Sequence, residues 1–435
     1  MLGLYKKVVY TLASFNKNYK RNFCVMFKPE YLDMSHIVSS PKIVRLFNAV
    51  EEHGGTIRFV GGAVRDTLAG LSGFDLDLAT DLSPDELAEA CQDNGLKTIP
   101  LGLKSGTLGV IIDDKVLEVS SLQKTRKTEA NKIITEFTDD WSSDASRRDL
   151  TINAVYADLH GNVFDYFNGI SDLEAGIVRF IGNPEDRIKE DYLRIMRFFR
   201  FYSRFGKAPM DKNALQACIK LKDGLRSIAI ERVRDELFKL LVTPNITETM
   251  RIIYDNDILG YFLPKSNHLD ALWRLTKLVA DAKYEGNFLR RLFVLYQPNS
   301  IQAENLASTL RFTKKQKDIF TAWSKVEINP TIATSADSIK RYIYRYGKQF
   351  VIDKILLGIA INKYPYSNVN KLLHEIENSV MPIFPLHGRD IVNLGITADK
   401  NIGKILRQAE LIWIDSGFTL TREELLDECR IRSKS

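Results

Sequence analysis

Long apolar runs, paired cysteines and metal-binding cysteine motifs are all missing from this chain of 435 residues. No apolar stretch approaches the roughly 18–20 residues that a membrane-spanning helix needs, so the sequence predicts no membrane span. The 4 cysteines show no C-x-x-C spacing, which disfavours a zinc site or a disulfide framework and indicates reduced, buried thiols. No histidine stands next to an aspartate, which disfavours an appended metal-dependent phosphohydrolase domain.

A strong excess of one charge is also missing. The chain has 61 Lys plus Arg against 55 Asp plus Glu, a balance that permits a nucleic-acid partner without requiring one. Acids are absent before Glu30, whereas residues 1–29 carry six basic residues: Lys6, Lys7, Lys17, Lys20, Arg21 and Lys28. A mitochondrial presequence has this pattern, and so has a disordered basic tail or a chain whose true start is Met26. We expect a cytoplasmic protein, or a mitochondrial one if residues 1–29 direct import.

Short strands alternate with helices between Ile57 and Tyr156, and helices alone follow from about Asn183. The expected strands are TIRFV, DLDLAT, TLGVIID, VLEVSSL and NVFDYF. SPDELAEACQDNG predicts a helix with Ser83 as its N-cap. The expected fold class is therefore α+β, with an α/β head followed by a long all-helical arm.

The stretch RFVGGAVRDTLAGLSGFDLDLATD holds the densest set of candidate site residues. Asp75 and Asp77 are two positions apart on an expected strand, so both carboxylates point to one face. Two such carboxylates suit Mg²⁺, which usually takes one or two of them plus phosphate oxygens. The glycines of the VGG stretch that ends the first strand leave the backbone free to approach a phosphate, and Arg65 follows on a turn or helix. By itself, however, a D-x-D pair is more commonly a solvated strand face.

Glu118 is a second kind of candidate, an acid within the otherwise apolar strand VLEVSSL. It is either a third metal-binding carboxylate or an ordinary acid on an edge strand, and the sequence favours neither interpretation.

Six motifs follow one another between Arg58 and Leu241: GGAVRD, DLDLAT, DASRRDLTINA, DYFNGISDL, EDYLRIMRFFRF and ERVRDELFKLL. HGRDIVNLGI, near the C-terminus, adds weaker support. In this order the motifs resemble the nucleotidyltransferase superfamily that includes DNA polymerase β. More specifically, the chain resembles the class II tRNA nucleotidyltransferase and bacterial poly(A) polymerase family.

The resemblance implies that Asp75 and Asp77 bind two metal ions. One ion would lower the pKa of the primer 3′-hydroxyl, and the other would neutralise the triphosphate and the leaving pyrophosphate. It also implies that Gly62 and Arg65 lie at the triphosphate and that Arg148 lies at the nucleotide.

In SRRDLTINA the resemblance further implies that Asp149 and Asn153 lie near the sugar or support a hinge. The alternative interpretation of RRD is the solvent-exposed start of a helix.

The segment EDYLRIMRFFR is expected to form one continuous helix. Its apolar stripe consists of Ile188, Tyr192, Ile195 and Phe199. Its outer side carries a fan of polar residues, namely Asp191, Arg194, Arg197 and Arg200. Because Asp191 and Arg194 are i,i+3 neighbours, they can act together on one object. The simplest alternative is a solvated ion pair of little energetic value.

A carboxylate and a guanidinium together can select bases. The carboxylate accepts from the exocyclic amino group of cytosine or adenine, and the guanidinium donates to a ring nitrogen or carbonyl. Uracil and guanine present a carbonyl oxygen instead of the amino group, so the carboxylate would repel them. The resemblance assigns this role to Asp191 and Arg194, with Arg197 and Arg200 nearby.

The chain departs from the family pattern in two places. Ser105-Gly106-Thr107 stands where the family has His-Gly-Thr, and Gln123 stands where an Arg is expected. The loop 120–135 also lacks glycine. Because the resemblance implies that this loop helps the pocket change from C to A, the addition of A has the least support from the sequence.

We therefore expect a template-independent, Mg²⁺-dependent enzyme that adds C, C and A to tRNA 3′ ends from CTP and ATP. Within the family the alternatives are a CC-adding enzyme, an A-adding enzyme and a poly(A) polymerase. A non-catalytic RNA-binding protein on the same scaffold is an alternative of another class. The expected partners are tRNA, CTP and ATP, with no membrane, and the protein is expected to be a monomer or homodimer.

The expected domains follow from the motifs and the helical arm. They are a basic extension (1–34), a nucleotidyltransferase head (35–174), a helical neck for base and RNA binding (175–242), a helical body (243–375) and a tRNA-binding tail (376–435).

Overall fold

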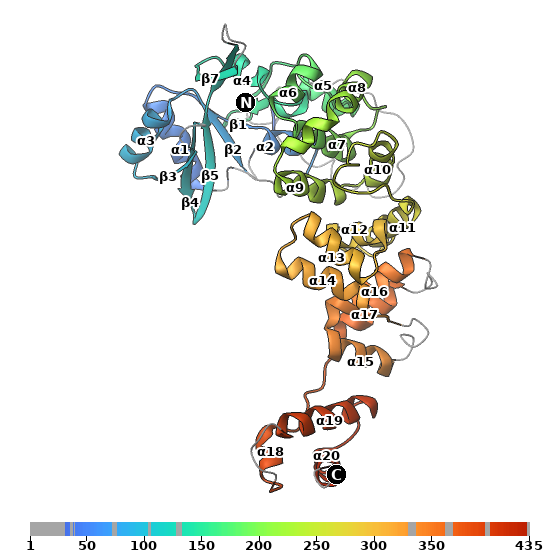
Figure 1. Cartoon of the computed structure of the whole chain (residues 1–435). Helices are drawn as coiled ribbons and strands as arrows, with labels where there is room; N and C mark the ends of the chain where they lie inside the picture. The colour runs from blue at the N-terminus through green and yellow to red at the C-terminus, as the bar shows by residue number, and fades with distance from the viewer. Residues whose placement is uncertain are drawn as a thin grey trace, which may run out of the picture. The chain divides into compact units, whose positions relative to one another are not determined.

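The computed structural model describes residues 31–34, 38, 40–71, 76–102, 106–127, 133–328, 336–361, 369–395 and 401–432. The chain divides into two compact units (Figure 1). Unit 1 comprises residues 1–123, 137–139 and 155–165, and unit 2 comprises residues 124–136, 140–154 and 166–435. Residues 1–29, Asp75, Ser105 and part of the loop 120–135 lie outside the described residues, so the expectations for them stay predictions.

Unit 1 contains a seven-stranded mixed sheet. In spatial order its strands are β3 (Lys97–Gly102), β4 (Thr107–Ile112), β5 (Lys115–Ser121), β2 (Asp77–Thr80), β1 (Ile57–Val60), β8 (Val155–Ala157) and β9 (Val163–Asp165). Only β2 and β5 pair in parallel. The five expected strands are confirmed as β1, β2, β4, β5 and β9.

Two strands of this sheet, β3 and β8, were not expected from the sequence. β3 contains Pro100 and lies at the edge of the sheet, where proline is tolerated because no donor is needed on the open side. β8 is only three residues long, too short to show an alternating pattern.

Helices cover one face of the sheet and leave carboxylates on the other. α1 (Pro41–Glu52) and α3 (Pro84–Asp93) pack on the covered face, where the rings of Phe47 and Phe59 lie 5.0 Å apart. The expected N-cap of α3 is confirmed, because Ser83 forms a capping box with Glu86. Glu118 is exposed between buried Leu117 and Val119, and Asp77 is exposed before buried Leu78, so both side chains point away from this core.

Unit 2 is almost entirely helical, as expected. β6 (Gln123–Lys127) and β7 (Ile133–Phe137) form a separate two-stranded sheet, whose residues 124–127 and 133–136 belong to this unit. The first helices are α4 (Trp141–Ser146), the 3₁₀ turn η2 (Thr151–Asn153), α5 (Gly169–Ala175), α6 (Pro184–Glu190), α7 (Arg194–Phe205), α8 (Lys212–Leu221), η3 (Lys222–Ser227), α9 (Ile230–Leu241) and α10 (Ile246–Asp255).

The helical series continues with α11 (Leu269–Asp281), α12 (Phe288–Tyr296), α13 (Ser300–Thr309), α14 (Lys314–Lys325), α15 (Ala336–Tyr346), α16 (Lys348–Ala360) and α17 (Val369–Asn378). One apolar core extends through these helices from Leu150 to Ile376. Among the described residues, no strand follows Asp165, which confirms the expected all-helical arm.

The last three helices, α18 (Gly388–Val392), α19 (Asn401–Asp415) and α20 (Arg422–Arg432), have a core of their own. Trp413 lies within this core. Tyr344 of α15 packs against the core, and its ring centroid lies 5.7 Å from that of Trp413. None of the described helices combines the length and the apolarity that a membrane crossing needs. The five expected domain limits are not tested by these observations and stay predictions.

The expectation of one continuous helix through EDYLRIMRFFR is wrong. α6 ends at Glu190 and α7 begins at Arg194, and Asp191 between them is extended with φ −154° and ψ 108°. The Oδ1 atom of Asp191 accepts a hydrogen bond from the Leu193 N–H at 3.1 Å, a local bond that competes with helix formation. The apolar stripe persists on both sides of the break, because Ile188 and Ile195 are fully buried.

Candidate functional site

The turn from β1 into α2 (Gly62–Leu68) brings Gly62 and Arg65 together. A Cβ atom added to Gly62 would lie 3.8 Å from Nη2 of Arg65. Arg65 is buried, and its Nε and Nη2 lie 2.8 and 2.7 Å from Oδ1 of Asp66. The residue that needs to be glycine is Gly61, with φ 64° and ψ −116°, a conformation that L-residues avoid. The sequence analysis named only Gly62 as a site residue, although it attributed the close backbone approach to the whole VGG stretch.

Two acids lie side by side on the open face of the sheet in unit 1. Asp77 is the first residue of β2, and in the parallel register it is directly opposite Glu118 of β5. Neighbouring strands are about 4.8 Å apart, so side chains at paired positions are in reach of one ion. Both residues are exposed. This register supports the interpretation of Glu118 as a metal-binding candidate over that of an edge-strand acid, since β5 lies between β4 and β2.

The donor chemistry of this pair fits a hard divalent cation, because both side chains offer carboxylate oxygens. Over the described parts of the chain, no group of three or more His, Cys, Asp or Glu side chains gathers in a metal-binding arrangement. Asp75, the other expected ligand, lies outside those parts. Asp77 and Glu118 are thus the two described residues that could hold a metal ion here.

In unit 2, a buried acid organises the arginines that follow α4. Asp144, with 1% of its side chain exposed, lies 2.8 Å from Nη2 of Arg147 and 3.1 Å from Nη2 of Arg148. The sequence analysis placed Arg148 at the nucleotide but did not name Asp144. The i,i+3 and i,i+4 spacing within DASRR was the available signal.

Asp149 is the centre of a second buried network. Its Oδ2 accepts from Nε of Arg197 at 2.6 Å, and its Oδ1 accepts from the Leu150 N–H and from Nδ2 of Asn153, both at 2.9 Å. Burial alone would raise the pKa of this carboxyl, but the charge of Arg197 and these hydrogen bonds lower the pKa to about 2. Asp149 therefore stays ionised and ties α7 to the η2 turn.

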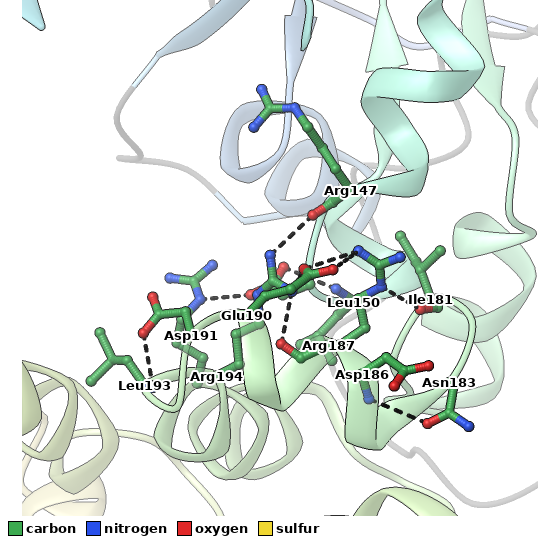
Figure 2. Close-up of polar contacts among 12 residues, drawn as sticks. Arg147, Leu150, Ile181, Asn183, Asp186, Arg187, Glu190, Asp191, Leu193 and Arg194 are labelled. Atoms are coloured by element: carbon green, nitrogen blue, oxygen red, sulfur yellow. Dashed lines mark hydrogen bonds and ion pairs between the residues drawn. The ribbon is translucent and has the colours of Figure 1, made fainter. Parts of the chain in front are cut away.

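Glu190 holds the guanidinium of Arg194, the first residue of α7, at a fixed place (Figure 2). Nη1 of Arg194 lies 2.5 Å from Oε2 of Glu190 and also donates to the Arg187 carbonyl at 2.9 Å. Nη2 donates to the Arg147 carbonyl at 3.0 Å. Arg187 in turn donates to both oxygens of Glu190, at 2.9 and 3.0 Å, and to the Ile181 carbonyl at 3.2 Å.

Asp191 pairs with an arginine that the sequence analysis did not name. Its Oδ2 lies 2.8 Å from Nη2 of Arg232 on α9, and no ion pair links it to Arg194. About a third of its side chain is exposed, and each carboxylate oxygen keeps an acceptor position beyond the one in use.

Arg197 and Arg200, the other two expected base-site residues, share Glu236 on α9. Nε of Arg200 lies 2.6 Å from Oε2 of this carboxylate, and Nη1 of Arg197 lies 3.8 Å from Oε1. Burial lowers the pKa of Arg200, although Glu236 partly opposes this effect. Glu190, Arg232 and Glu236 were not among the expected site residues. Their motifs were recognised, but only the packing of α6, α7 and α9 shows which charge meets which.

Arg194 keeps N–H donors that could form hydrogen bonds to a ligand. Two of its atoms, Nη1 and Nη2, make three hydrogen bonds, which leaves Nε–H and one Nη2–H without an acceptor among the described residues. Asp191, three residues earlier in the same turn, offers acceptors. A carboxylate and a guanidinium with open N–H donors, three residues apart, have the acceptor and donor groups that the edge of a planar base can meet.

Two family models and many known proteins match this chain. Residues 57–179 match the poly A polymerase head domain, and residues 209–269 match a probable RNA- and SrmB-binding site of polymerase A. The chain is 34% identical over 380 residues to the human mitochondrial CCA tRNA nucleotidyltransferase 1, covering 85% of each protein. It is 26% identical to the CCA-adding enzyme of Staphylococcus haemolyticus, covering 88% of this chain and 95% of the relative.

The chain belongs to the CCA-adding tRNA nucleotidyltransferase family. The protein is therefore an RNA nucleotidyltransferase, and this family generally uses a divalent metal ion. The crystal structure of the Bacillus stearothermophilus CCA-adding enzyme in complex with CTP shares the fold, with a TM-score of 0.71 and 23% identity. The similarity covers 90% of this chain and 97% of that enzyme, which confirms the expected α+β class.

Replacement of Asp149 by Asn should lower the free energy of unfolding by about 2 kcal/mol at pH 7, because the neutral amide cannot pair with the Arg197 charge. The folded pKa of about 2 lies below the ordinary value of 3.8. The stabilisation is therefore complete above about pH 4 and is lost as the pH falls toward 2.

Urea unfolding at pH 7 and pH 3 measures this effect. The difference between the wild type and Asp149→Asn should narrow at pH 3. Asp318→Asn, at an exposed position of α14, is the matched control and should behave like the wild type at both pH values. A difference that is the same at both pH values would contradict the role given to the Asp149 carboxylate.

Proposed function

We propose that this enzyme adds C, C and A in turn to the 3′ end of tRNA, from CTP and ATP and without a nucleic-acid template. The observation that carries the proposal is that Asp191 and Arg194, three residues apart, are each held by other partners, which leaves acceptors on Asp191 and two N–H donors on Arg194. In the reaction, the 3′-oxygen of the tRNA forms a bond to the α-phosphorus of the nucleotide. The bond between the α-phosphorus and the bridging oxygen breaks, pyrophosphate leaves, and the hydroxyl proton passes to solvent.

Asp77 and Asp75 would hold Mg²⁺, with Glu118 opposite Asp77 as a possible third carboxylate. Bound Mg²⁺ would make the primer hydroxyl a better nucleophile and neutralise charge on the triphosphate. The β1–α2 turn with Gly62 and Arg65 is proposed to receive the triphosphate, because the Gly61 conformation lets the backbone approach closely.

Base selection is proposed to depend on Asp191 and Arg194. Cytosine would donate its N4 amino group to Asp191 and accept from Arg194 at N3 and O2. Adenine would donate N6 and accept at N1. Uracil O4 or guanine O6 would face the Asp191 carboxylate, and two acceptors with no proton between them repel.

The other arginines expected in the site would assist Asp191 and Arg194 in binding the nucleotide. Arg148 is proposed to contact the nucleotide while Asp144 holds its guanidinium. Arg197 and Arg200 are proposed to lie at the nucleotide too. Because Asp149 and Glu236 already bind their Nε atoms, they also fix the position of α7.

The helical arm is proposed to receive the tRNA, with residues 175–242 near the 3′ end and residues 376–435 farther along the RNA. The protein is proposed to act as a monomer or a homodimer. The mitochondrial names of the animal relatives favour import through residues 1–29 over a cytoplasmic location.

The number and identity of the nucleotides added to the tRNA distinguish CCA addition from its alternatives. A tRNA transcript that ends before CCA should gain two nucleotides with CTP alone and three with CTP plus ATP, resolved to one nucleotide on a gel. Extension by CTP only would indicate a CC-adding enzyme, extension of a CC-ending tRNA by one A only would indicate an A-adding enzyme, and long A tails would indicate a poly(A) polymerase.

Asp77→Asn should abolish the addition of both C and A, by at least about a thousandfold, because one amide oxygen replaces a charged metal ligand. Binding of tRNA, followed by gel shift, should remain. Glu89→Gln, an exposed position on α3 of the same unit, is the matched control and should keep full activity. Retained addition in Asp77→Asn would remove this residue from the metal site.

Asp191→Asn should relax base choice, because the amide can donate to uracil O4 where the carboxylate repels it. The preference for CTP over UTP in single-nucleotide incorporation should fall by at least about tenfold, since unpaired polar groups cost roughly 1–3 kcal/mol. Asp186→Asn, one turn earlier on α6, is the control and should leave the preference unchanged. Unaltered rejection of UTP by Asp191→Asn would refute the proposed role.

Residues 1–29 fused to a fluorescent protein should bring it into mitochondria, and changing the six basic residues in this stretch to Gln should leave it in the cytosol. Diffuse fluorescence of the unmodified fusion would favour the cytoplasmic location.

A further inference from the structure

Unit 2 contains a pocket of about 750 Å³ that none of the proposed site residues lines. Its walls come from the end of α7, the α9–α10 connection, α11 and the start of α12, and α10 packs against both α7 and α11 (Figure 1). The volume lies within the roughly 300–1,000 Å³ typical of small-molecule sites.

The pocket has an aromatic wall with an exposed tryptophan. Tyr202, Trp273 and Tyr284 contribute to the wall, and Trp273 is 54% exposed. The other three tryptophans are at most 9% exposed. A large ring left open to solvent in a concave site offers a flat surface on which a planar ligand can stack. Nζ of Lys277 lies over the Trp273 ring, 5.4 Å from its centroid, so a cation stands above one face of the ring and the other face is the one on which a ligand would stack.

The charges in the pocket favour an anion. Arg291 is 6% exposed and its Nη1 donates to the carbonyls of Leu241 and Thr243 at 2.6 and 2.7 Å, near the end of α9. These bonds hold the guanidinium in place, but among the described residues no carboxylate pairs with it or with Lys277. The lone acid of the pocket, Glu248, pairs with Arg251. A buried guanidinium without a counter-ion attracts an anionic group from solution.

We propose that this pocket binds a nucleoside phosphate, with its base stacked on Trp273 and its phosphate directed toward Lys277 and Arg291. Asn245, Thr247 and Thr276 in the wall can form hydrogen bonds to the sugar or base. An RNA strand fits less well, because a strand needs an extended basic groove and this pocket has two cations in one place.

The bound nucleotide would differ from the one being added. Tyr202 follows Arg194 by eight residues on α7, which separates the two positions by about 12 Å along the helix axis. The proposal does not depend on the proposed function, because it concerns residues that take no part in base selection.

The fluorescence of Trp273 can be used to test the proposal. ATP or CTP added to the full-length enzyme should quench tryptophan fluorescence to saturation, and adenosine or tripolyphosphate alone should bind at least about tenfold more weakly. Trp273→Phe should remove most of the quenching. Lys277→Met should raise the Kd for ATP at least about fivefold, whereas Lys212→Met, at an exposed position of α8, should not change it.

The number of nucleotides bound per chain distinguishes binding in this pocket from binding in the catalytic site. Equilibrium dialysis with labelled CTP should count two nucleotides per wild-type chain and one per chain of the Trp273→Ala/Lys277→Met variant, with an unchanged far-UV circular dichroism spectrum. One nucleotide per chain in both proteins would overturn the proposal. So would quenching of Trp273 by a tRNA acceptor minihelix but not by free nucleotides, since the pocket would then be an RNA contact.

Discussion

Neutralisation of the arginines on α7 is the constraint on which the proposed base-reading side of unit 2 depends. Arg194, Arg197 and Arg200 recur every three residues and would repel one another without carboxylates between them. Those carboxylates are Glu190, Asp149 and Glu236, supplied by α6, by the segment before η2 and by α9. The ion pairs thereby join segments up to 48 positions apart in the chain and leave only selected N–H donors available.

The same principle explains why Asp191 and Arg194 can act as a pair without binding each other. If they formed an ion pair, each would use the groups that a base needs. Arg232 pairs with one side of the Asp191 carboxylate, and Glu190 occupies Nη1 of Arg194. Their remaining acceptor and donor positions are held in place by neighbours, which reduces the rearrangement that binding a base would require.

The pocket beside Trp273 differs from this network in its charge balance. Arg194, Arg197 and Arg200 of α7 each meet a carboxylate, whereas Arg291 and Lys277 meet none among the described residues. The open sheet face of unit 1 has the opposite excess, since Asp77 and Glu118 lie together there. Unit 1 thus has an anionic site suited to a cation, and the pocket of unit 2 has a cationic site suited to an anion.

The sequence by itself determined the fold class, five strands of the sheet and the motifs that contain the site, because alternating and helical apolar patterns and glycine turns are local properties. Its motifs also predicted Asp77, Arg148, Asp191 and Arg194 as site residues. Only the tertiary structure decided that Asp191 interrupts the helix and pairs with Arg232, and that Glu118 lies opposite Asp77. Those facts depend on which segments pack together and in which register, and no local pattern in the chain encodes a contact across 41 residues.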